Sequence, residues 1–340
     1  MTELGPTDLD RLGRWLSDAG EPVAGPLHAT LLTGGRSNLT YWLDDGVAAW
    51  ALRRPPLGGV VGSAHDVVRE YRVVAALGGT AVPVARAVAC DADGAVLGAP
   101  CAVVDFVPGR TVRSTADLEG WTDTDVDRCA GALVDALEAL HRVDPAGVGL
   151  GDFGRPGSYA ERQLRTWARQ WARMEAEDPR ADRLHGLLTE RVPEQERTTV
   201  VHGDYRVDNV LLDPSDPGLV LAVVDWELST LGDPVADIAT MCAYRHPAFS
   251  DVLGVDAAWT SDRFPSPAEL RHRYETRSGR SLPGFDFHVA LAYYKLAVIA
   301  EGIAFRHRLG VTSGGQGYDG VAAAVPALLE AGLDAARGAP

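Results

Sequence analysis

The chain has 340 residues, of which 46% are hydrophobic and 23% are charged, a composition that is ordinary for a globular protein with one large domain or two lobes. Its formal net charge of −15 argues against a nucleic-acid-binding surface, and neither a secretory signal nor an uninterrupted apolar stretch of membrane-spanning length is evident. The four cysteines are scattered without a CxxC pair, which favours free thiols in a reducing compartment, so we expect a cytoplasmic protein that binds neither nucleic acid nor membrane.

The N-terminal third has the pattern of a twisted sheet with one helix. Two strands flank a glycine-containing bend, and a third strand ends at two prolines. A helix follows with apolar residues at helical spacing, and then two strands joined by the turn Asp-Ala-Asp-Gly. Pro108 and Gly109 break this pattern, so we place the end of the first lobe at residue 107. The predicted strands cover residues 27–32, 39–43, 47–56, 82–90 and 99–107, and the helix covers 63–77.

Beyond residue 108 the chain is predicted to be mainly helical. Residues 122–143 and 159–174 each place apolar side chains on one face of a helix. The longest apolar segment, residues 287–307, carries Lys295 and Glu301 in its middle and is therefore expected to be a core helix. The chain is thus expected to be an α+β protein, with lobes at residues 1–107 and 108–340.

The most informative motif is the run VHGDYRVDNVLLD at residues 201–213. It places His202, Asp204 and Asn209 in the order His-x-Asp-x4-Asn, and Asp225 follows at the end of an apolar strand. The sequence has two asparagines in all, so an asparagine at this position is seldom a coincidence. In phosphoryl transfer of the kinase type, such an aspartate takes the acceptor hydroxyl proton, while an asparagine and a later aspartate hold Mg²⁺. We therefore predict Asp204 as the catalytic residue and Asn209 and Asp225 as magnesium ligands.

A cation for the nucleotide phosphates is expected on the third strand. Because side chains alternate along a strand, Ala51 and Arg53 share one face and Arg54 lies on the other. Ala51 would cover the adenine, and Arg53 would hold the phosphates and pair with Glu70 of the following helix. Arginine stands here in place of the usual lysine, since the one lysine in the sequence is Lys295. Arg54 is the alternative if the face assignment is shifted by one residue.

Further nucleotide contacts are expected in the glycine bend and at the crossing between the lobes. Backbone N–H groups of a glycine bend can approach phosphates closely, and the backbone at the crossing can meet the adenine edge. The candidates are Gly34, Gly35, Ser37 and Asn38 in the bend, and Asp105 and Val107 at the crossing.

Three polar residues are expected to support the catalytic loop instead of reacting. His202 is expected to hold the loop in place. Asp233 and Asp237 stand four residues apart at the start of a predicted helix, where capping and loop support are their expected roles.

At these residues the chain resembles the aminoglycoside phosphotransferase family of small-molecule kinases. The similarity runs from GGRSNLTYWL through ALRRPP, REYRVVAAL, VVDFVPG and LEALHRVD to VHGDYRVDN and VVDWELSTLGDPVADIA. The resemblance implies a bilobal, protein-kinase-like fold with a small, mainly antiparallel N-lobe and a larger, mainly helical C-lobe. It also implies ATP or GTP as donor, Mg²⁺ as cofactor, Asp204 as the catalytic aspartate and a small-molecule hydroxyl as acceptor.

Within this family, HGDYR and the late segment YYKLAVIAEGIAFRH look closer to the branch that is fused to acyl-CoA dehydrogenases than to drug-resistance enzymes. That branch suggests a hydroxy acid or a hydroxyacyl thioester as the substrate instead of an aminoglycoside. Arg206 and Lys295 are then candidate contacts for the anionic group of the substrate.

Two other functions stay open from the sequence. A nucleotide-binding pseudokinase is suggested by Arg53, and a hydrolase or phosphatase would use the same carboxylates on a metal ion. The sequence contains neither GxSxG nor HExxH, which removes the common hydrolase classes. A GxGxxG match at residues 149–154 follows a predicted helix and not a strand, so it does not indicate a dinucleotide site. The acceptor and the oligomeric state are not predicted.

Overall fold

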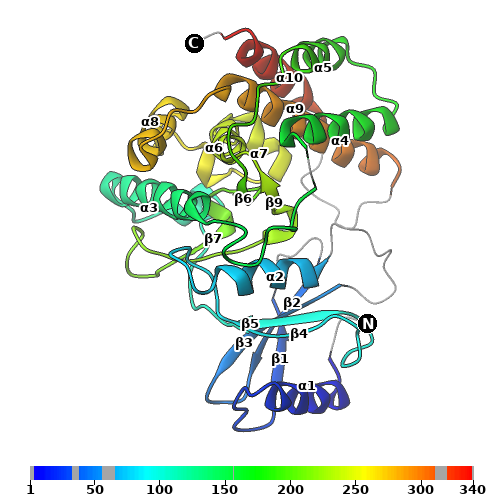
Figure 1. Cartoon of the computed structure of the whole chain (residues 1–340), viewed down its shortest axis with the longest axis vertical. Helices are drawn as coiled ribbons and strands as arrows, with labels where there is room; N and C mark the ends of the chain where they lie inside the picture. The colour runs from blue at the N-terminus through cyan, green and yellow to red at the C-terminus, as the bar shows by residue number, and fades with distance from the viewer. Residues whose placement is uncertain (1–3, 33–37, 56–65, 156, 311–319, 339–340) are drawn as a thin grey trace.

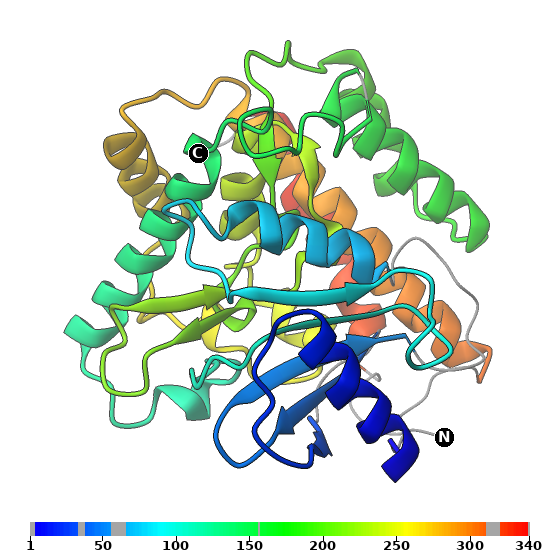
Figure 2. The same ribbon diagram turned by 60° about the horizontal axis from the view of Figure 1, so that its bottom comes forward.

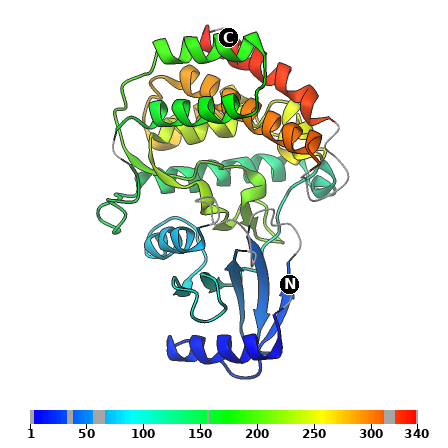
Figure 3. The same cartoon turned by 90° about the vertical axis from the view of Figure 1, so that its right-hand side faces the viewer.

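The computed structural model describes residues 4–32, 38–55, 66–155, 157–310 and 320–338. It has two lobes, a smaller one built on a five-stranded sheet and a larger one that is mainly helical (Figure 1, Figure 3). The predicted α+β class with two lobes is confirmed. The sheet ends at Asp105, so the predicted lobe boundary at residue 107 falls in the connection that follows it.

The elements of the N-lobe are α1 (Pro6–Asp18), β1 (His28–Leu31), β2 (Leu39–Asp44), β3 (Ala49–Arg54), α2 (Val67–Leu77), β4 (Ala87–Asp91) and β5 (Cys101–Asp105). The helices of the C-lobe are α3 (Asp123–Arg142), α4 (Tyr159–Arg173), α5 (Pro179–Glu190), α6 (Pro234–Ala243), α7 (Ala248–Leu253), α8 (Pro267–Ser278), α9 (Phe285–Arg308) and α10 (Val321–Ala336). Its short strands are β6 (Thr199–Val201), β7 (Val210–Leu212), β8 (Val220–Val223) and β9 (Thr230–Gly232).

The N-lobe sheet is antiparallel throughout, in the order β1-β2-β3-β5-β4. Burial alternates along β3, with Trp50 and Leu52 buried on the face that packs against Leu12 and Leu16 of α1. Burying these apolar side chains away from water holds α1 on the sheet. The opposite face of β3, which carries Ala51 and Arg53, is therefore left for the cleft between the lobes.

Helix α2 lies between the sheet and the C-lobe, on the side of the sheet away from α1 (Figure 1, Figure 2). It begins at Val67, close to the predicted start at or near residue 63, which itself lies outside the described residues. The Asp66 side chain caps the helix by accepting a hydrogen bond of 2.9 Å from the Arg69 N–H. The guanidinium of Arg69 also donates to two C-lobe carbonyls, those of Phe153 at 2.7 Å and Ser229 at 3.1 Å. It lies 3.7 Å from the centre of the Phe153 ring. The helix is thereby fixed to the C-lobe as well as to the sheet.

The C-lobe has one large apolar core to which all eight of its named helices contribute. Helix α9 runs through it and packs against α4, α6 and α10. Among the described residues, α9 is the helix that is long and apolar enough to cross a membrane by length and composition, but 67% of its most apolar window is buried inside the protein. It has the packing of a core helix, as the sequence predicts.

Two short hairpins carry the polar motif to the cleft. Strand β6 pairs with β9, and β7 pairs with β8. The second hairpin sets Val210 opposite Val223, and the Val224 N–H donates to the Asn209 carbonyl at 2.9 Å. The residues that flank this hairpin, Asn209 on one side and Asp225 on the other, are therefore brought together.

Candidate active site

The cleft between the lobes collects most of the predicted site residues and has a volume of about 930 Å³. The residues that line it include Ala51, Arg53 and Glu70 from the N-lobe, Asp105 and Val107 from the connection, and Asp204, Arg206, Asn209 and Asp225 from the C-lobe. Gly34, Gly35 and Ser37 lie outside the described residues.

Asp204 lies at the centre of the cleft with 20% of its side chain exposed. Its Oδ2 accepts a hydrogen bond of 3.0 Å from Asn209 Nδ2, and its Oδ1 accepts one from the Tyr244 hydroxyl. Burial alone would raise the pKa of the Asp204 carboxyl, but the charges of Arg206 and Lys295 and the Tyr244 hydrogen bond outweigh it and lower the pKa. The group is therefore an anion that can accept a hydroxyl hydrogen bond.

Asn209 and Asp225 offer oxygen atoms to the same part of the cleft. The Asn209 amide nitrogen donates to the Asp204 carbonyl at 2.7 Å as well as to its carboxylate, which leaves the amide oxygen for another partner. Asp225 follows β8 in the left-handed conformation, with φ of 66°, an uncommon geometry for a residue other than glycine that is often found at functional sites. Its carboxylate is 36% exposed.

These two oxygen donors fit a magnesium ion. Mg²⁺ prefers oxygen ligands and is usually held by one or two carboxylates together with substrate phosphates and water. No group of three or more His, Cys, Asp or Glu side chains that could hold a metal ion occurs within the described ranges.

Arg53 joins the N-lobe to this group. Its Nη1 lies 2.9 Å from Glu70 Oε2, and its Nη2 lies 3.7 Å from Asp225 Oδ1. Glu70 also accepts a hydrogen bond of 3.1 Å from the buried Asn38 side chain. Burial raises the pKa of Glu70 to about 7, against the lowering effect of the Arg53 charge. The structure thus brings Arg53 and Glu70 together as the predicted ion pair.

Arg54, the alternative cation, points away from the cleft. It is 2% exposed, and its Nη2 donates to the Tyr41 hydroxyl at 3.1 Å on the other face of the sheet. Arg53 is therefore the cation of β3 that faces the cleft.

The connection between the lobes forms one wall of the cleft. The Asp105 N–H donates to the Arg86 carbonyl at 2.9 Å, and the Phe106 N–H to the Ala49 carbonyl at 3.0 Å. In the part of the chain that the structure describes, the Val107 N–H makes no hydrogen bond. This N–H group can therefore donate a hydrogen bond to a ligand that binds against this wall.

The carboxylate of Asp237 holds the loop that precedes Asp204 by hydrogen bonds to its backbone. It accepts hydrogen bonds from the N–H groups of His202 at 2.6 Å and Gly203 at 2.8 Å. His141 Nε2 lies 3.2 Å from the same carboxylate. Burial would raise the pKa of Asp237, but the hydrogen bond and charge of His141 lower it. The Asp233 side chain caps α6 through the Val235 N–H, so both aspartates have the geometry expected of support.

His202 and Lys295 hold the loop from two other sides. His202 Nε2 lies 2.9 Å from the Val224 carbonyl, next to Asp225. The Lys295 ammonium, buried in α9, donates to the Gly203 carbonyl at 2.6 Å and is not among the residues described as lining the cleft. Lys295 therefore contacts the loop backbone, whereas Arg206 faces the cleft with an Nη1 that lies 3.0 Å from Asp208.

Tyr244 is a site residue that the sequence analysis does not single out. It caps the C-terminal end of α6 and donates its hydroxyl to Asp204. Its ring stacks on that of Phe249 with 4.4 Å between centroids, and the guanidinium carbon of Arg206 lies 5.5 Å from the Tyr244 ring. No motif in the sequence links residue 244 to residue 204.

The cleft wall beyond Asp204 is apolar. It is formed by side chains of α7 and α9, with two exposed arginines also lining the cleft. The apolar residues are Phe249, Val252, Leu253, Leu296, Ile299 and Ile303, and the arginines are Arg113 and Arg306.

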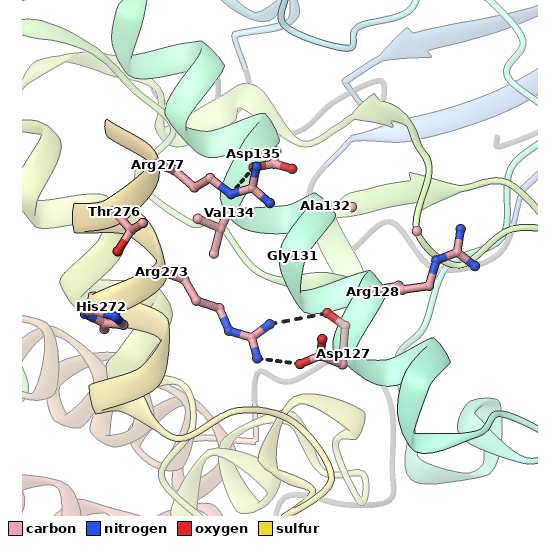
Figure 4. A pocket seen from close by; sticks show the side chains of 11 residues that line it. Asp127, Arg128, Gly131, Ala132, Val134, Asp135, His272, Arg273, Thr276 and Arg277 are labelled. Carbon is pink, nitrogen blue, oxygen red and sulfur yellow. Dashed lines mark hydrogen bonds and ion pairs between the residues drawn. The ribbon is translucent and has the colours of Figure 1, made fainter. Parts of the chain in front are cut away.

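A second hollow, of about 580 Å³, lies between α3 and α8 (Figure 4). Two ion pairs cross it: Arg273 contacts Asp127, and Arg277 Nε lies 3.2 Å from Asp135. These pairs join the two helices, so the charged side chains that form them have a structural role.

The fold and the cleft together define a phosphotransferase with a protein-kinase-like fold. The chain belongs to the phosphotransferase enzyme family, whose model matches residues 28–288. The predicted family is thereby confirmed.

Two solved structures illustrate the fold. A "putative aminoglycoside phosphotransferase" of Ralstonia eutropha JMP134 is 34% identical, with a TM-score of 0.83 over 97% of this chain and 98% of that one. A thermostable mutant of aminoglycoside phosphotransferase APH(4)-Ia, solved with AMP-PNP and hygromycin B, is 14% identical, with a TM-score of 0.58 over 92% of this chain and 94% of that one. The second likeness supports the fold alone.

Curated relatives lie in the predicted branch. Acyl-CoA dehydrogenase family member 10 of Mus musculus is 33% identical over 89% of this chain, and family member 11 of Gallus gallus is 33% identical over 96%. The chain spans 29% and 42% of the lengths of these two proteins.

Proposed function

We propose that this protein transfers the γ-phosphate of ATP, or of GTP, to a hydroxyl group of a small molecule. The observation that carries the proposal is the convergence of Asp204, Asn209 and Asp225 in one cleft beneath the pair of Arg53 and Glu70. A structural neighbour was solved with AMP-PNP, which supports a nucleotide as donor.

In this proposal some residues of the cleft bind the nucleotide and others bind the acceptor. Ala51 and the Val107 N–H would contact the adenine, and Arg53 would hold phosphate oxygens. Asn209 and Asp225 would hold Mg²⁺, which supplies charge neutralisation at the phosphates when it is bound. Asp204 would accept a hydrogen bond from the acceptor hydroxyl, orient that oxygen toward the γ-phosphorus and take its proton late in the transfer.

The acceptor side of the cleft favours a partly apolar, anionic molecule. Phe249, Leu253 and Ile299 form an apolar wall, and Arg206 and Arg306 bring positive charge to it. A hydroxy acid or a hydroxyacyl thioester would bury its chain on this wall, and the exposed Arg306 could pair with its acid group. We therefore propose this substrate class, in line with the relatives named as acyl-CoA dehydrogenase family members.

The remaining expectations accompany this proposal. The partner is a small molecule, and neither nucleic acid nor membrane is part of the function that we propose. All four cysteines are free, which supports a reducing, cytoplasmic setting.

The test is a magnesium-ATP transfer assay on a panel of amino sugars, hydroxy acids and hydroxyacyl thioesters, with the phosphorylated product detected by mass spectrometry. We expect product with the second or third class. Asp204→Asn should lower transfer by about a hundredfold or more while nucleotide binding persists. Asp135→Asn, a surface change in the second hollow, is the matched control.

Two results would contradict the proposal. Nucleotide binding without any turnover would identify a pseudokinase, which the replacement of lysine by Arg53 makes the main competing function. Phosphate release without any phosphorylated acceptor, from compounds that already carry phosphate, would identify a phosphatase.

A further inference from the structure

We propose that the Tyr244 hydroxyl occupies the place of the acceptor hydroxyl on Asp204 between turnovers and thereby restrains the hydrolysis of bound ATP by water. This inference rests on the proposed function, because it takes Asp204 as the group that orients the attacking oxygen. It assigns Tyr244 as a positioning residue that acts through Asp204.

Both carboxylate oxygens of Asp204 already have donors. Oδ2 is bound by Asn209 at 3.0 Å, and Oδ1 is bound by the Tyr244 hydroxyl. Because Asn209 is also a proposed magnesium ligand, Oδ1 is the oxygen on which an acceptor hydroxyl would be oriented. Each carboxylate oxygen can accept two hydrogen bonds, so an acceptor or a water molecule competes with the phenol for the lone pair of Oδ1 that the phenol occupies.

The phenol is held in place by its surroundings and not by the hydrogen bond alone. Tyr244 is 2% exposed, and its ring stacks on Phe249 at an interplanar angle of 30°. The guanidinium carbon of Arg206 lies 5.5 Å from the Tyr244 ring and 5.2 Å from the Phe249 ring. The side chain thus has little freedom to leave, and a small, weakly bound water does not displace it as readily as a tightly bound substrate does.

Helix α6 holds the loop and the phenol in a fixed relation. Asp237 and Tyr244 are seven residues apart, which is about two helical turns, so both lie on the same side of the helix. Asp237 binds the backbone N–H groups of His202 and Gly203, while Tyr244 binds the side chain of Asp204. The same helix therefore fixes both the catalytic backbone and the oxygen that faces the acceptor.

The phenol keeps its proton in this position. Burial and the Asp204 charge raise the pKa of Tyr244 well above its usual value. Its hydroxyl therefore donates a hydrogen bond to Asp204, as the hydroxyl of the phosphate-accepting substrate would. It is not activated as a phenolate nucleophile.

The inference predicts that losing the hydroxyl increases wasteful hydrolysis. Acceptor-independent release of phosphate from magnesium-ATP should rise about tenfold or more in Tyr244→Phe, since the variant lacks the hydrogen bond from the phenol to the Asp204 carboxylate. More ATP should also be consumed per molecule of phosphorylated product. The ring remains in this variant, so stacking on Phe249 is kept.

Two further variants separate this role from general support of the site. Tyr294→Phe changes a buried tyrosine of α9 outside the cleft and should leave hydrolysis unchanged. Phe249→Leu keeps the Tyr244 hydroxyl but loosens its ring, and it should raise hydrolysis by a smaller factor. Thermal unfolding of each variant checks that the fold is retained.

The outcomes are distinct. Hydrolysis that stays constant, or that falls together with transfer, in Tyr244→Phe overturns this inference and leaves the proposed function standing. A phosphate found on Tyr244 after incubation with ATP also overturns it, because the residue would then be an acceptor. If the wild-type protein turns over no ATP with or without an acceptor, both the inference and the proposed function fail.

Discussion

The guanidinium of Arg53 lies 2.9 Å from the carboxylate of Glu70, so a strand of the N-lobe and a helix that is anchored to the C-lobe share one ion pair. The same guanidinium is 3.7 Å from Asp225. Arg53 therefore has two acidic partners, one structural and one that we propose as a magnesium ligand. The pair with Glu70 holds the guanidinium in place, and bound phosphates would accept hydrogen bonds from the N–H groups that Glu70 leaves free.

Replacing Arg53 tests its role as the nucleotide cation. We expect Arg53→Met to raise the KM for ATP about tenfold or more, because a hydrogen bond to a charged group contributes about 1.5–3 kcal/mol. Arg53→Lys should recover part of this loss, since the charge returns without the planar fork. Initial rates at varied ATP measure the effect, and Arg14→Met on the exposed side of α1 serves as the control. An unchanged KM would remove Arg53 from the nucleotide site.

The pKa of Glu70, about 7, predicts a pH dependence of nucleotide binding. Lowering the pH from 8 to 6 protonates this carboxyl and removes its charge from the pair with Arg53. The KM for ATP should therefore rise as the pH falls through 7. Glu70→Gln should bind ATP more weakly than the wild type at pH 8. In this variant the KM for ATP should no longer rise as the pH falls through 7. A wild-type profile that the variant reproduces would show that another group titrates.

Asp225→Asn should change the response to magnesium. The variant keeps an oxygen ligand but loses the negative charge that attracts the ion. We expect the magnesium concentration for half-maximal nucleotide binding to rise more than about tenfold. Losing a residue that only supports a metal ligand already lowers metal affinity by about 10–100-fold. Titration of nucleotide binding with MgCl₂ measures it. Asp216→Asn, on the turn between β7 and β8, should leave the titration as it is in the wild type.

Gly203→Ala should destabilise the catalytic loop. Gly203 has φ of 82°, and a Cβ there would lie 2.7 Å from the Leu228 carbonyl oxygen. The left-handed conformation alone costs about 1–2 kcal/mol for other residues, so the free energy of unfolding should fall by at least that amount. Gly186→Ala in α5, where a Cβ meets nothing within 4 Å, should instead stabilise by about 0.5–1 kcal/mol. Denaturant unfolding of both variants measures whether the free energy of unfolding falls in Gly203→Ala and rises in Gly186→Ala.

Much of the fold and the nucleotide side of the cleft could be predicted because they depend on local patterns. Alternation along residues 49–54 placed Ala51 and Arg53 on the cleft face. The short spacing from Asp204 to Asn209, with Asp225 one hairpin later, was sufficient to bring these three side chains together. Residues close in sequence have few ways to be arranged.

The acceptor side could not be predicted because it depends on packing between distant helices. Tyr244 reaches Asp204 across 40 residues, and that contact depends on how α6 lies over the catalytic loop. Lys295 stands out in the sequence as the single lysine, yet its ammonium donates to the Gly203 carbonyl. The sequence does not specify where this side chain points. The exact first residue of α2, Val67, could not be predicted either, since the capping by Asp66 depends on side-chain geometry.

The attachment of α2 to the C-lobe has a consequence for control. Arg69 ties this helix to the carbonyls of Phe153 and Ser229, and the Arg72 guanidinium donates to the Gly149 carbonyl at 3.0 Å. Protein kinases are switched off by displacing the equivalent helix with its glutamate. Here that displacement would require three hydrogen bonds between the lobes to break, so we expect α2 to keep its position whether or not nucleotide is bound.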